Sequence, residues 1–427
     1  MLLRRVAQFA VVLGLVAMGV WFVRGKQWER FQNKPEVAAQ PAIKPRSAAD
    51  IIPQLESPPK RKGVTVQDIM AGKVPSLSQA EVEAFLRENG RTARNLLAAS
   101  RLLKDLKYAR EAAILEPQNP LAQLEIALRG ETPEEKGAAL AAFRKIAPDN
   151  SLGDYLAAHQ AFQSGDAGAA GAALLQSLDN PLFADYSQQV IDGSEQAYLN
   201  AGYEAQAASV AAMFSLTIER AQPLLSLAEN LKGLQDEFIR TADFDAAEPT
   251  VIIGLTLGQR IQEQGPYLID QLMGINIERK FLQQLDPLTA AGPGGQTAAA
   301  RLETLDANLL EIKTLSSGFA EALVTMDDAT RSQYLAKMKA EGELTALRWL
   351  AARRSHAPAF GRHTAAARSA RSADPTSRHH SRDTPYSILY TLAAFAFTSA
   401  PRPNGGRRAR LRPSSWRDTG CAWRRPS

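Results

Sequence analysis

The chain has 427 residues, of which 45% are hydrophobic and 22% are charged, and its formal net charge is +5. That charge is an average over three unlike parts. Residues 1–75 have 12 basic and 5 acidic side chains, residues 76–352 have 23 basic and 37 acidic ones, and residues 353–427 have 15 basic and 3 acidic ones. The basic total therefore gives no reason to expect a nucleic-acid-binding domain, and because Cys421 is the one cysteine, the acidic middle can form neither a disulfide nor a thiolate metal site.

The first segment, residues 1–30, has the pattern of a membrane anchor. An uncharged run over residues 6–23 is flanked by Arg and Lys on both sides. As a helix this run would span about 27 Å, close to the roughly 30 Å of a hydrocarbon core. We predict an uncleaved, single-pass signal anchor in a bacterial inner membrane, with the remainder of the chain in the periplasm. A signal peptide cleaved near Gly19 is the alternative.

Residues 31–75 are expected to be a disordered linker. They contain seven prolines and few large apolar side chains, so they cannot bury enough surface to offset the loss of chain entropy on folding. We therefore expect an extended tether between the membrane and a folded domain that begins near residue 76.

Residues 76–215 show helix signals at short intervals. Ser78 and Thr132 are each followed three residues later by glutamate, which is typical of a helix start, and Pro133 suits the first helical position. Pro117 ends one predicted helix, and Asn119 caps the next. The turn between these two helices is short, so they should pack antiparallel.

The stop signal at Pro117 recurs at Pro148 and Pro181, at spacings of 31 and 33 residues. A period in the low thirties made of two short helices resembles the tetratricopeptide repeat. The best match is residues 155–181, where Tyr155, Ala158 and Phe162 stand at the aromatic, small and aromatic positions of the first helix. His159 departs from the pattern because the repeat usually has glycine there, so we describe the repeats as tetratricopeptide-like.

Residues 216–352 predict longer helices. Leucines from Leu224 to Leu234 form one stripe, and a near-heptad runs over residues 302–326 with an interruption at Ser316. We expect both stripes to pack within a solenoid or bundle, with a coiled coil as the alternative. Residues 286–297 predict a loop, and the stretch "GELTALRWL" predicts a helix that closes the array.

Four stretches, "LLAASRLLKD", "APDNSLGDYL", "LNAGY" and "GELTALRWL", make the chain similar to a group of bacterial membrane-anchored helical-repeat proteins over residues 1–353. The resemblance implies an anchor, a proline-rich linker and an all-α domain, and it implies no activity.

Few residues could support catalysis. His159 is the only histidine before residue 356, and "GPGGQT" at 292–297 lacks the lysine of a phosphate-binding loop. "DFDAAE" at 243–248 is too short for a calcium loop, and we interpret it as a turn before a helix that starts at Pro249. We predict no enzymatic activity, no cofactor and no metal. A metal-assisted hydrolase is the weakest alternative, and it would need carboxylates to converge on His159 in one pocket.

The interval between Lys145 and Arg220 contains no Lys or Arg, although it holds several acids. Repeat solenoids commonly bind peptides along one face, so we predict that this interval binds a basic segment of a partner protein. The alternative is that these charges are spread over solvated faces. The predicted partner-binding residues are Asp154, Asp166, Asp185, Asp192, Glu195 and Glu204.

Residues 353–427 differ from the rest of the chain, with 15 arginines, no lysine and four of the five histidines. We hypothesise a disordered tail that arises from a frameshift in a GC-rich gene. The alternative is a genuine arm that makes the protein a nucleic-acid or anionic-lipid adaptor. The function that the sequence favours is a membrane-anchored scaffold for protein–protein interactions in the cell envelope.

Overall fold

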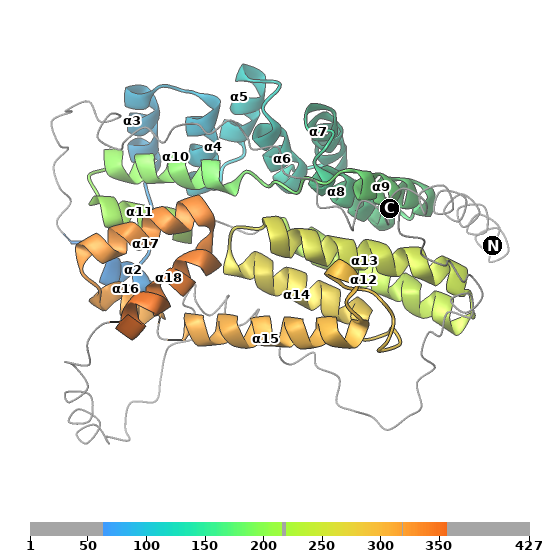
Figure 1. The fold of residues 1–427 in the computed structure, drawn as a ribbon. Helices are drawn as coiled ribbons and strands as arrows, with labels where there is room; N and C mark the ends of the chain where they lie inside the picture. Colours follow the sequence, from blue (N-terminus) through green and yellow to red (C-terminus); the bar gives the residue numbers. More distant parts are fainter. Residues whose placement is uncertain (1–62, 216–218, 318, 357–427) are drawn as a thin grey trace, which may run out of the picture.

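The computed structural model describes residues 63–215, 219–317 and 319–356, and this part of the chain is all-α. It holds 17 α-helices, one 3-10 turn and no strand (Figure 1). The predicted anchor, most of the linker and nearly all of the tail lie outside the described residues. Among the described helices, none is both long enough and apolar enough to cross a membrane.

The first ten helices cover residues 66–214. They are α2 (Val66–Met70), α3 (Gln79–Asn89), α4 (Ala93–Leu103), α5 (Lys107–Leu115), α6 (Pro120–Arg129), α7 (Pro133–Ile146), α8 (Ser151–Ser164), α9 (Ala167–Asp179), α10 (Ser187–Asn200) and α11 (Ala205–Phe214).

The remaining helices cover residues 221–356 and include the two longest. They are α12 (Ala221–Arg240), α13 (Phe244–Gln264), α14 (Leu268–Leu282), the 3-10 turn η2 (Pro293–Gly295), α15 (Ala298–Ser316), α16 (Phe319–Thr325), α17 (Asp328–Glu341) and α18 (Glu343–His356).

Helices α3 to α9 form a row in which each helix packs on the next in sequence, as expected for helical repeats (Figure 1). The chain then turns back: α10 lies across α3 and α4, and α12 packs against α8. Helices α12 to α15 form a second layer, and the chain closes on itself because α2 contacts both α11 and α16.

Local signals placed most of the predicted helix starts correctly. Ser78 and Glu81 form the reciprocal capping box of α3, and Asn119 caps α6 with Pro120 at its first position. The hydroxyl of Thr132 accepts the N–H of Glu135, as predicted, but the carboxylate of Glu135 bonds to the N–H of Glu131. The predicted loop at 286–297 is confirmed, with η2 as its one helical turn.

Two boundaries were predicted wrongly. The fold already includes α2, where Val66 and Ile69 are buried in the core, because a five-residue helix is too short to show periodicity in sequence. The second error is at Pro249, which lies inside α13 rather than at its start. Asp243 caps that helix with a bond to the N–H of Ala246, and burial of Pro249 in the core keeps the helix continuous despite the missing N–H donor.

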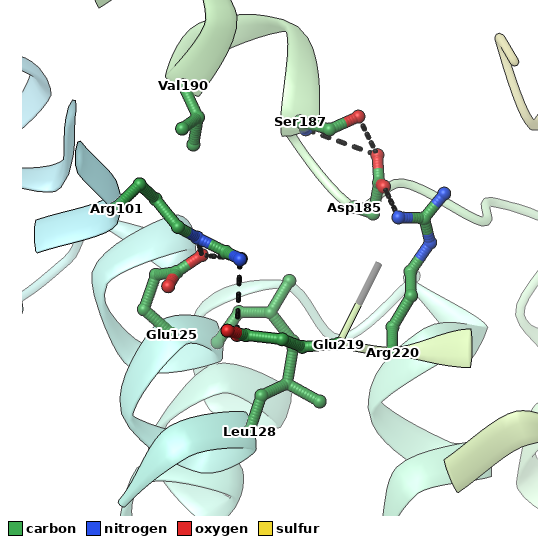
Figure 2. A pocket seen from close by; sticks show the side chains of 9 residues that line it. Arg101, Glu125, Leu128, Asp185, Ser187, Val190, Glu219 and Arg220 are labelled. Atoms are coloured by element: carbon green, nitrogen blue, oxygen red, sulfur yellow. Dashed lines mark hydrogen bonds and ion pairs between the residues drawn. The ribbon is translucent and has the colours of Figure 1, made fainter. Parts of the chain in front are cut away.

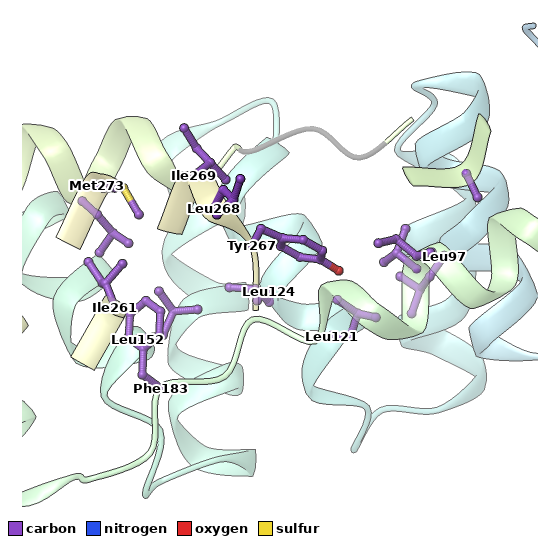
Figure 3. Packing of buried hydrophobic residues seen from close by; sticks show 14 of the residues in the cluster. Leu97, Leu121, Leu124, Leu152, Phe183, Ile261, Tyr267, Leu268, Ile269 and Met273 are labelled. Atoms are coloured by element: carbon purple, nitrogen blue, oxygen red, sulfur yellow. The ribbon is translucent and has the colours of Figure 1, made fainter. Parts of the chain in front are cut away.

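A single hydrophobic cluster runs through both layers. Figure 3 shows Leu97, Leu121 and Leu124 of the repeat row in the same cluster as Tyr267 and Met273 of the second layer. The predicted stripe of α12 is confirmed as core packing, since Leu224, Leu227 and Leu231 are buried, and the near-heptad after residue 302 is divided between α15 and α16.

Helices α13 and α14 approach each other closely at two glycines. A Cβ on Gly258 would lie 2.8 Å from the carbonyl oxygen of Gly274, and a Cβ on Gly274 would lie 2.5 Å from the carbonyl oxygen of Gly258. Any larger residue at either position would force the two backbones apart. Next to this contact, the carboxylate of the buried Glu278 accepts hydrogen bonds from Nε and Nη2 of Arg301 and from the side-chain amides of Gln259 and Gln262.

Candidate interaction site

Helices α8 to α11 occupy the interval that lacks Lys and Arg, and they carry or flank all six predicted partner-binding acids. The structure separates these acids into exposed, partly exposed and buried ones. That separation decides which of them a partner could reach in this conformation.

Asp154 is not at the surface. It is 2% exposed, and its carboxylate accepts hydrogen bonds from Arg144 at 2.9 Å and from Asn180 at 2.6 Å. Burial raises its pKa, while the bonds from Asn180 and Arg144 act in the opposite direction. Asp154 therefore joins α7, α8 and the end of α9 from within the fold.

Asp166 and Glu204 are the two exposed members. Each stands at the N-cap of a helix, α9 and α11 respectively. The carboxylate of Asp166 accepts the N–H of Ala169 at 2.9 Å, whereas the side chain of Glu204 makes no cap hydrogen bond. These two carboxylates are accessible to solvent and to a partner.

Asp192 and Glu195 lie one turn apart on α10 and are partly exposed. Lys339 of α17 forms an ion pair with each of them, at 3.8 Å from Asp192 and at hydrogen-bond distance from Glu195. Arg94 of α4 lies 3.9 Å from the other oxygen of Asp192. A basic side chain already occupies this acidic position, and it comes from the same chain.

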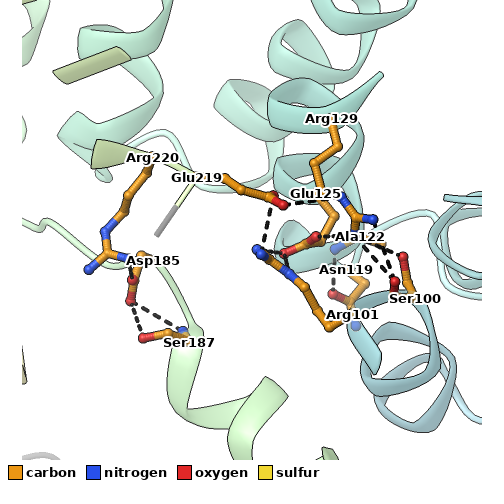
Figure 4. Close-up of polar contacts among 10 residues, drawn as sticks. All are labelled: Ser100, Arg101, Asn119, Ala122, Glu125, Arg129, Asp185, Ser187, Glu219 and Arg220. Carbon is orange, nitrogen blue, oxygen red and sulfur yellow. Dashed lines mark hydrogen bonds and ion pairs between the residues drawn. The ribbon is translucent and has the colours of Figure 1, made fainter. Parts of the chain in front are cut away.

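Asp185, the sixth member, precedes α10 and belongs to a buried charged cluster. Its carboxylate accepts hydrogen bonds from the N–H and the hydroxyl of Ser187 and pairs with Arg220 (Figure 4). Arg220 also pairs with Asp270, which is fully buried and accepts the N–H of Tyr267.

Glu343, the first residue of α18, completes this group, because its carboxylate accepts the N–H of Leu268 at 2.8 Å and acts electrostatically on Asp270. We call Asp185, Arg220, Asp270 and Glu343 the acid-rich cluster. Burial raises the pKa of Asp270 to about 6 and that of Glu343 to about 7. Two of these carboxylates, Asp185 and Asp270, share the guanidinium of Arg220, and Glu343 adds a third negative charge beside Asp270.

A second buried cluster adjoins the first, and we call it the paired cluster. Glu125 of α6 pairs with Arg101 of α4 and, at 3.3 Å, with Arg129 of its own helix. Both arginines also pair with Glu219, at 3.1 Å from Arg101 and 3.4 Å from Arg129. Two acids and two bases thus form a closed ring (Figure 4). Glu219 and Arg220 are adjacent in sequence and join the two clusters.

The two clusters line a small pocket beneath the start of α10 (Figure 2). Arg101, Glu125 and Glu219 form one side, Asp185 and Arg220 form the other, and Val190 lies above. The enclosed space suits about one water molecule. We therefore interpret the pocket as the meeting point of two structural clusters rather than as a substrate site.

His159 does not gather a reactive group around it. It is half-buried on α8, its buried Nδ1 has no hydrogen-bond partner among the described residues, and burial lowers its pKa. It does not line the pocket, and no group of three potential metal ligands occurs in the described part of the chain. In the described part of the chain, carboxylates thus do not converge on His159 in one pocket, as a metal-assisted hydrolase would require.

Sequence reasoning did not single out Arg101, Glu125, Asp270 or Glu343. Their charges are visible in sequence, but their burial depends on contacts between distant helices. The one available signal was position: Asp270 lies three residues after Tyr267, the N-cap residue of α14, whose N–H its carboxylate accepts. In comparisons with protein-family models, curated proteins and solved structures, no match to this chain was found.

Proposed function

We propose that the protein is a membrane-anchored helical-repeat scaffold that binds partner proteins in the bacterial cell envelope. The observation that carries the proposal is the composition of α8 to α11, four consecutive helices without a Lys or Arg. Of the six predicted partner-binding acids, the reachable ones are the exposed Asp166 and Glu204 and the partly exposed Asp192 and Glu195. A surface with this bias attracts and orients a segment of opposite charge.

The arrangement of the repeat row supports the same proposal. Sequentially packed helix pairs present long, regular surfaces on which peptides bind in other repeat proteins. The predicted anchor at residues 6–23 would hold this surface near the membrane, and the proline-rich segment would set its distance from the bilayer. The resemblance to tetratricopeptide repeats is part of the proposal rather than a finding.

The test uses the full chain in detergent micelles, immobilised and incubated with cell-envelope extract. Retained proteins are identified by mass spectrometry for the wild type, for the double variant Asp166→Lys/Glu204→Lys, and for a control, Glu303→Lys, which reverses an exposed acid on α15. The double reversal should weaken retention of a specific partner by roughly tenfold, since each interfacial charge contributes about 0.5–1 kcal/mol.

The control should retain the partner as the wild type does. If the double variant and the control retain the same proteins equally well, the acidic helices are not the binding surface and the proposal in this form is wrong. Recovered partners should then be titrated as purified proteins at two salt concentrations, because binding through this surface must weaken as salt rises.

A further inference from the structure

The C-terminal helices α17 and α18 pack against each other and return over the first half of the fold. Figure 1 shows α17 beside α10 and α11. The contacts of α17 with these two helices include several polar ones: Lys339 binds Glu195 and Asp192, and Gln206 donates to the carbonyl oxygen of Asp328 and to the hydroxyl of Ser332. Beside these polar contacts, α17 and α18 also bury apolar side chains in the core, among them Tyr334, Met338 and Leu347.

Helix α18 is attached to the second layer at two places: Arg348 pairs with Glu311 of α15, and the start of α18 forms a joint with the start of α14. There the N–H of Glu343 donates to the carbonyl oxygen of Pro266 at 2.8 Å, and its carboxylate accepts the N–H of Leu268 at 2.8 Å. Gly342 makes this close approach possible: its φ is +88°, and a Cβ there would lie 3.1 Å from the oxygen of Pro266. The joint therefore depends on the carboxylate of Glu343.

The charges around this joint do not balance. Four groups from different elements surround Asp270. They are Arg220 at the start of α12, Asp185 before α10, Tyr267 at the start of α14, and Glu343 at the start of α18. Among the described residues, Arg220 is the one cation that acts on Asp270, and it is shared with Asp185. When all the carboxylates are ionised, Asp270 and Glu343 repel each other across the joint.

We propose that α17 and α18 form a pH-sensitive latch, which is held closed on α10 and α11 at mildly acidic pH and loosens as the pH rises through neutrality. The joint between Glu343 and the start of α14 is the titrating element. The polar contacts of Lys339 and Gln206 are the contacts that loosen.

The direction follows from the protonation equilibria. The pKa values of Asp270 and Glu343, about 6 and about 7, lie above their ordinary values of 3.8 and 4.5. The closed latch therefore binds protons more tightly than an open latch whose carboxylates are hydrated. Its stabilisation is complete below the ordinary values and is lost as the pH rises through the raised ones.

Loosening of the latch would affect partner binding, a consequence that rests on the proposed function. Lys339 covers Glu195 and Asp192, two of the predicted partner-binding acids. An open latch would uncover both acids and make them available to a basic segment of a partner. The latch would then regulate the scaffold's own binding surface.

Hydrogen exchange of the full chain in detergent micelles, read by mass spectrometry at about pH 5 and about pH 8, tests the latch. After correction for intrinsic exchange, opening of residues 328–356 should increase roughly tenfold between these pH values. In the variant Asp270→Asn/Glu343→Gln, which keeps one acceptor oxygen at each position, the increase should vanish and protection should stay high.

The matched control is Glu311→Gln, which removes a carboxylate that pairs with Arg348 of α18 and whose pKa is lowered. This variant should keep the wild-type pH response. Equal pH responses in the double variant and the wild type, or a flat response in the wild type, would overturn the latch.

A second measurement separates the latch from the proposed function. A synthetic lysine-rich helical peptide, whose charge is constant over this range, should bind the wild type several-fold more tightly at about pH 8 than at about pH 5. Lys339→Gln should bind it tightly at both values. A pH-dependent exchange response without peptide binding would retain the latch and refute the uncovering of a binding surface.

Discussion

The charged clusters on either side of the Glu219–Arg220 peptide bond use the same residue types in different proportions. In the paired cluster, two arginines alternate with two glutamates, so each ion has two partners. In the acid-rich cluster, Arg220 pairs with Asp185 and Asp270, and no cation among the described residues pairs with Glu343. Burial is costly for both clusters, and it also raises the pKa of Glu125, but removal of that carboxylate would leave two buried arginines short of a counter-charge. The same substitution, acid to amide, should therefore have opposite effects in the two places.

The largest effect is expected from Glu125→Gln in the paired cluster. It leaves Arg101 and Arg129 with one carboxylate between them, at a position where Glu125 is 1% exposed. Loss of one partner from a buried ion network costs about 3–5 kcal/mol, so the free energy of unfolding should fall by about 3 kcal/mol. Urea unfolding followed by circular dichroism measures this. A cost below about 1 kcal/mol would show that the ring does not stabilise the fold.

Arg220→Met should be the next most harmful change, and its effect should depend on pH. Without Arg220, Asp185 and Asp270 lose their shared cation, and the loss at about pH 8 should be about 2–3 kcal/mol. At about pH 5 the loss should be smaller, because Asp270, whose pKa is raised to about 6, then carries a proton. Paired urea titrations at both pH values test this. An equal loss at both would contradict the raised pKa of Asp270.

Glu343→Gln should have the opposite sign and stabilise the protein. The pKa of Glu343 is raised from 4.5 to about 7, so the ionised carboxylate destabilises the fold above that pH. Glutamine keeps an acceptor for the N–H of Leu268 without the charge, and it should add about 1 kcal/mol at about pH 8 and nothing at about pH 4. Thermal unfolding at the two pH values measures the difference. Destabilisation of the variant at about pH 8 would mean that neighbouring groups stabilise the ionised carboxylate of Glu343.

The smallest effects are expected outside both clusters, at the exposed acids. Asp166→Ala should cost about 1 kcal/mol, because it removes the N-cap bond to Ala169. Glu204→Ala should change stability by less than about 0.5 kcal/mol, since that side chain makes no cap bond. Urea midpoints of the two variants, measured side by side, separate a capping carboxylate from a free surface one. Equal midpoints would remove the distinction.

The sequence predicted most helix starts, because a capping residue and the N–H that it satisfies lie within three positions of each other. The sequence also led us to interpret the interval without Lys or Arg as an acidic surface. It could not show that cations distant in the chain neutralise some of these acids. The cations that neutralise Asp154, Asp185 and Glu195 are Arg144, Arg220 and Lys339, and all three lie outside the interval that has no basic residue.

A local count of charges therefore could not show which acids are engaged within the fold. Lys339 is 144 positions from Glu195, and Arg220 is 50 positions from Asp270. These pairs depend on the return of α12, α14 and α17 over the repeat row, which has no local signal. By contrast, Asp166 at a helix cap could be placed from its neighbours alone, and its exposure agrees with that placement.

The contact between α2 and α16 bears on how the chain folds during synthesis. The two helices are separated by roughly 250 residues, so at about 5–20 residues per second the ribosome takes about 12–50 seconds to supply the partner of α2. Until then Val66 and Ile69 lack part of their native surroundings, although the repeat row between α3 and α9 can form from neighbouring helices. Closure should therefore be a late event, with α2 the segment most dependent on a chaperone.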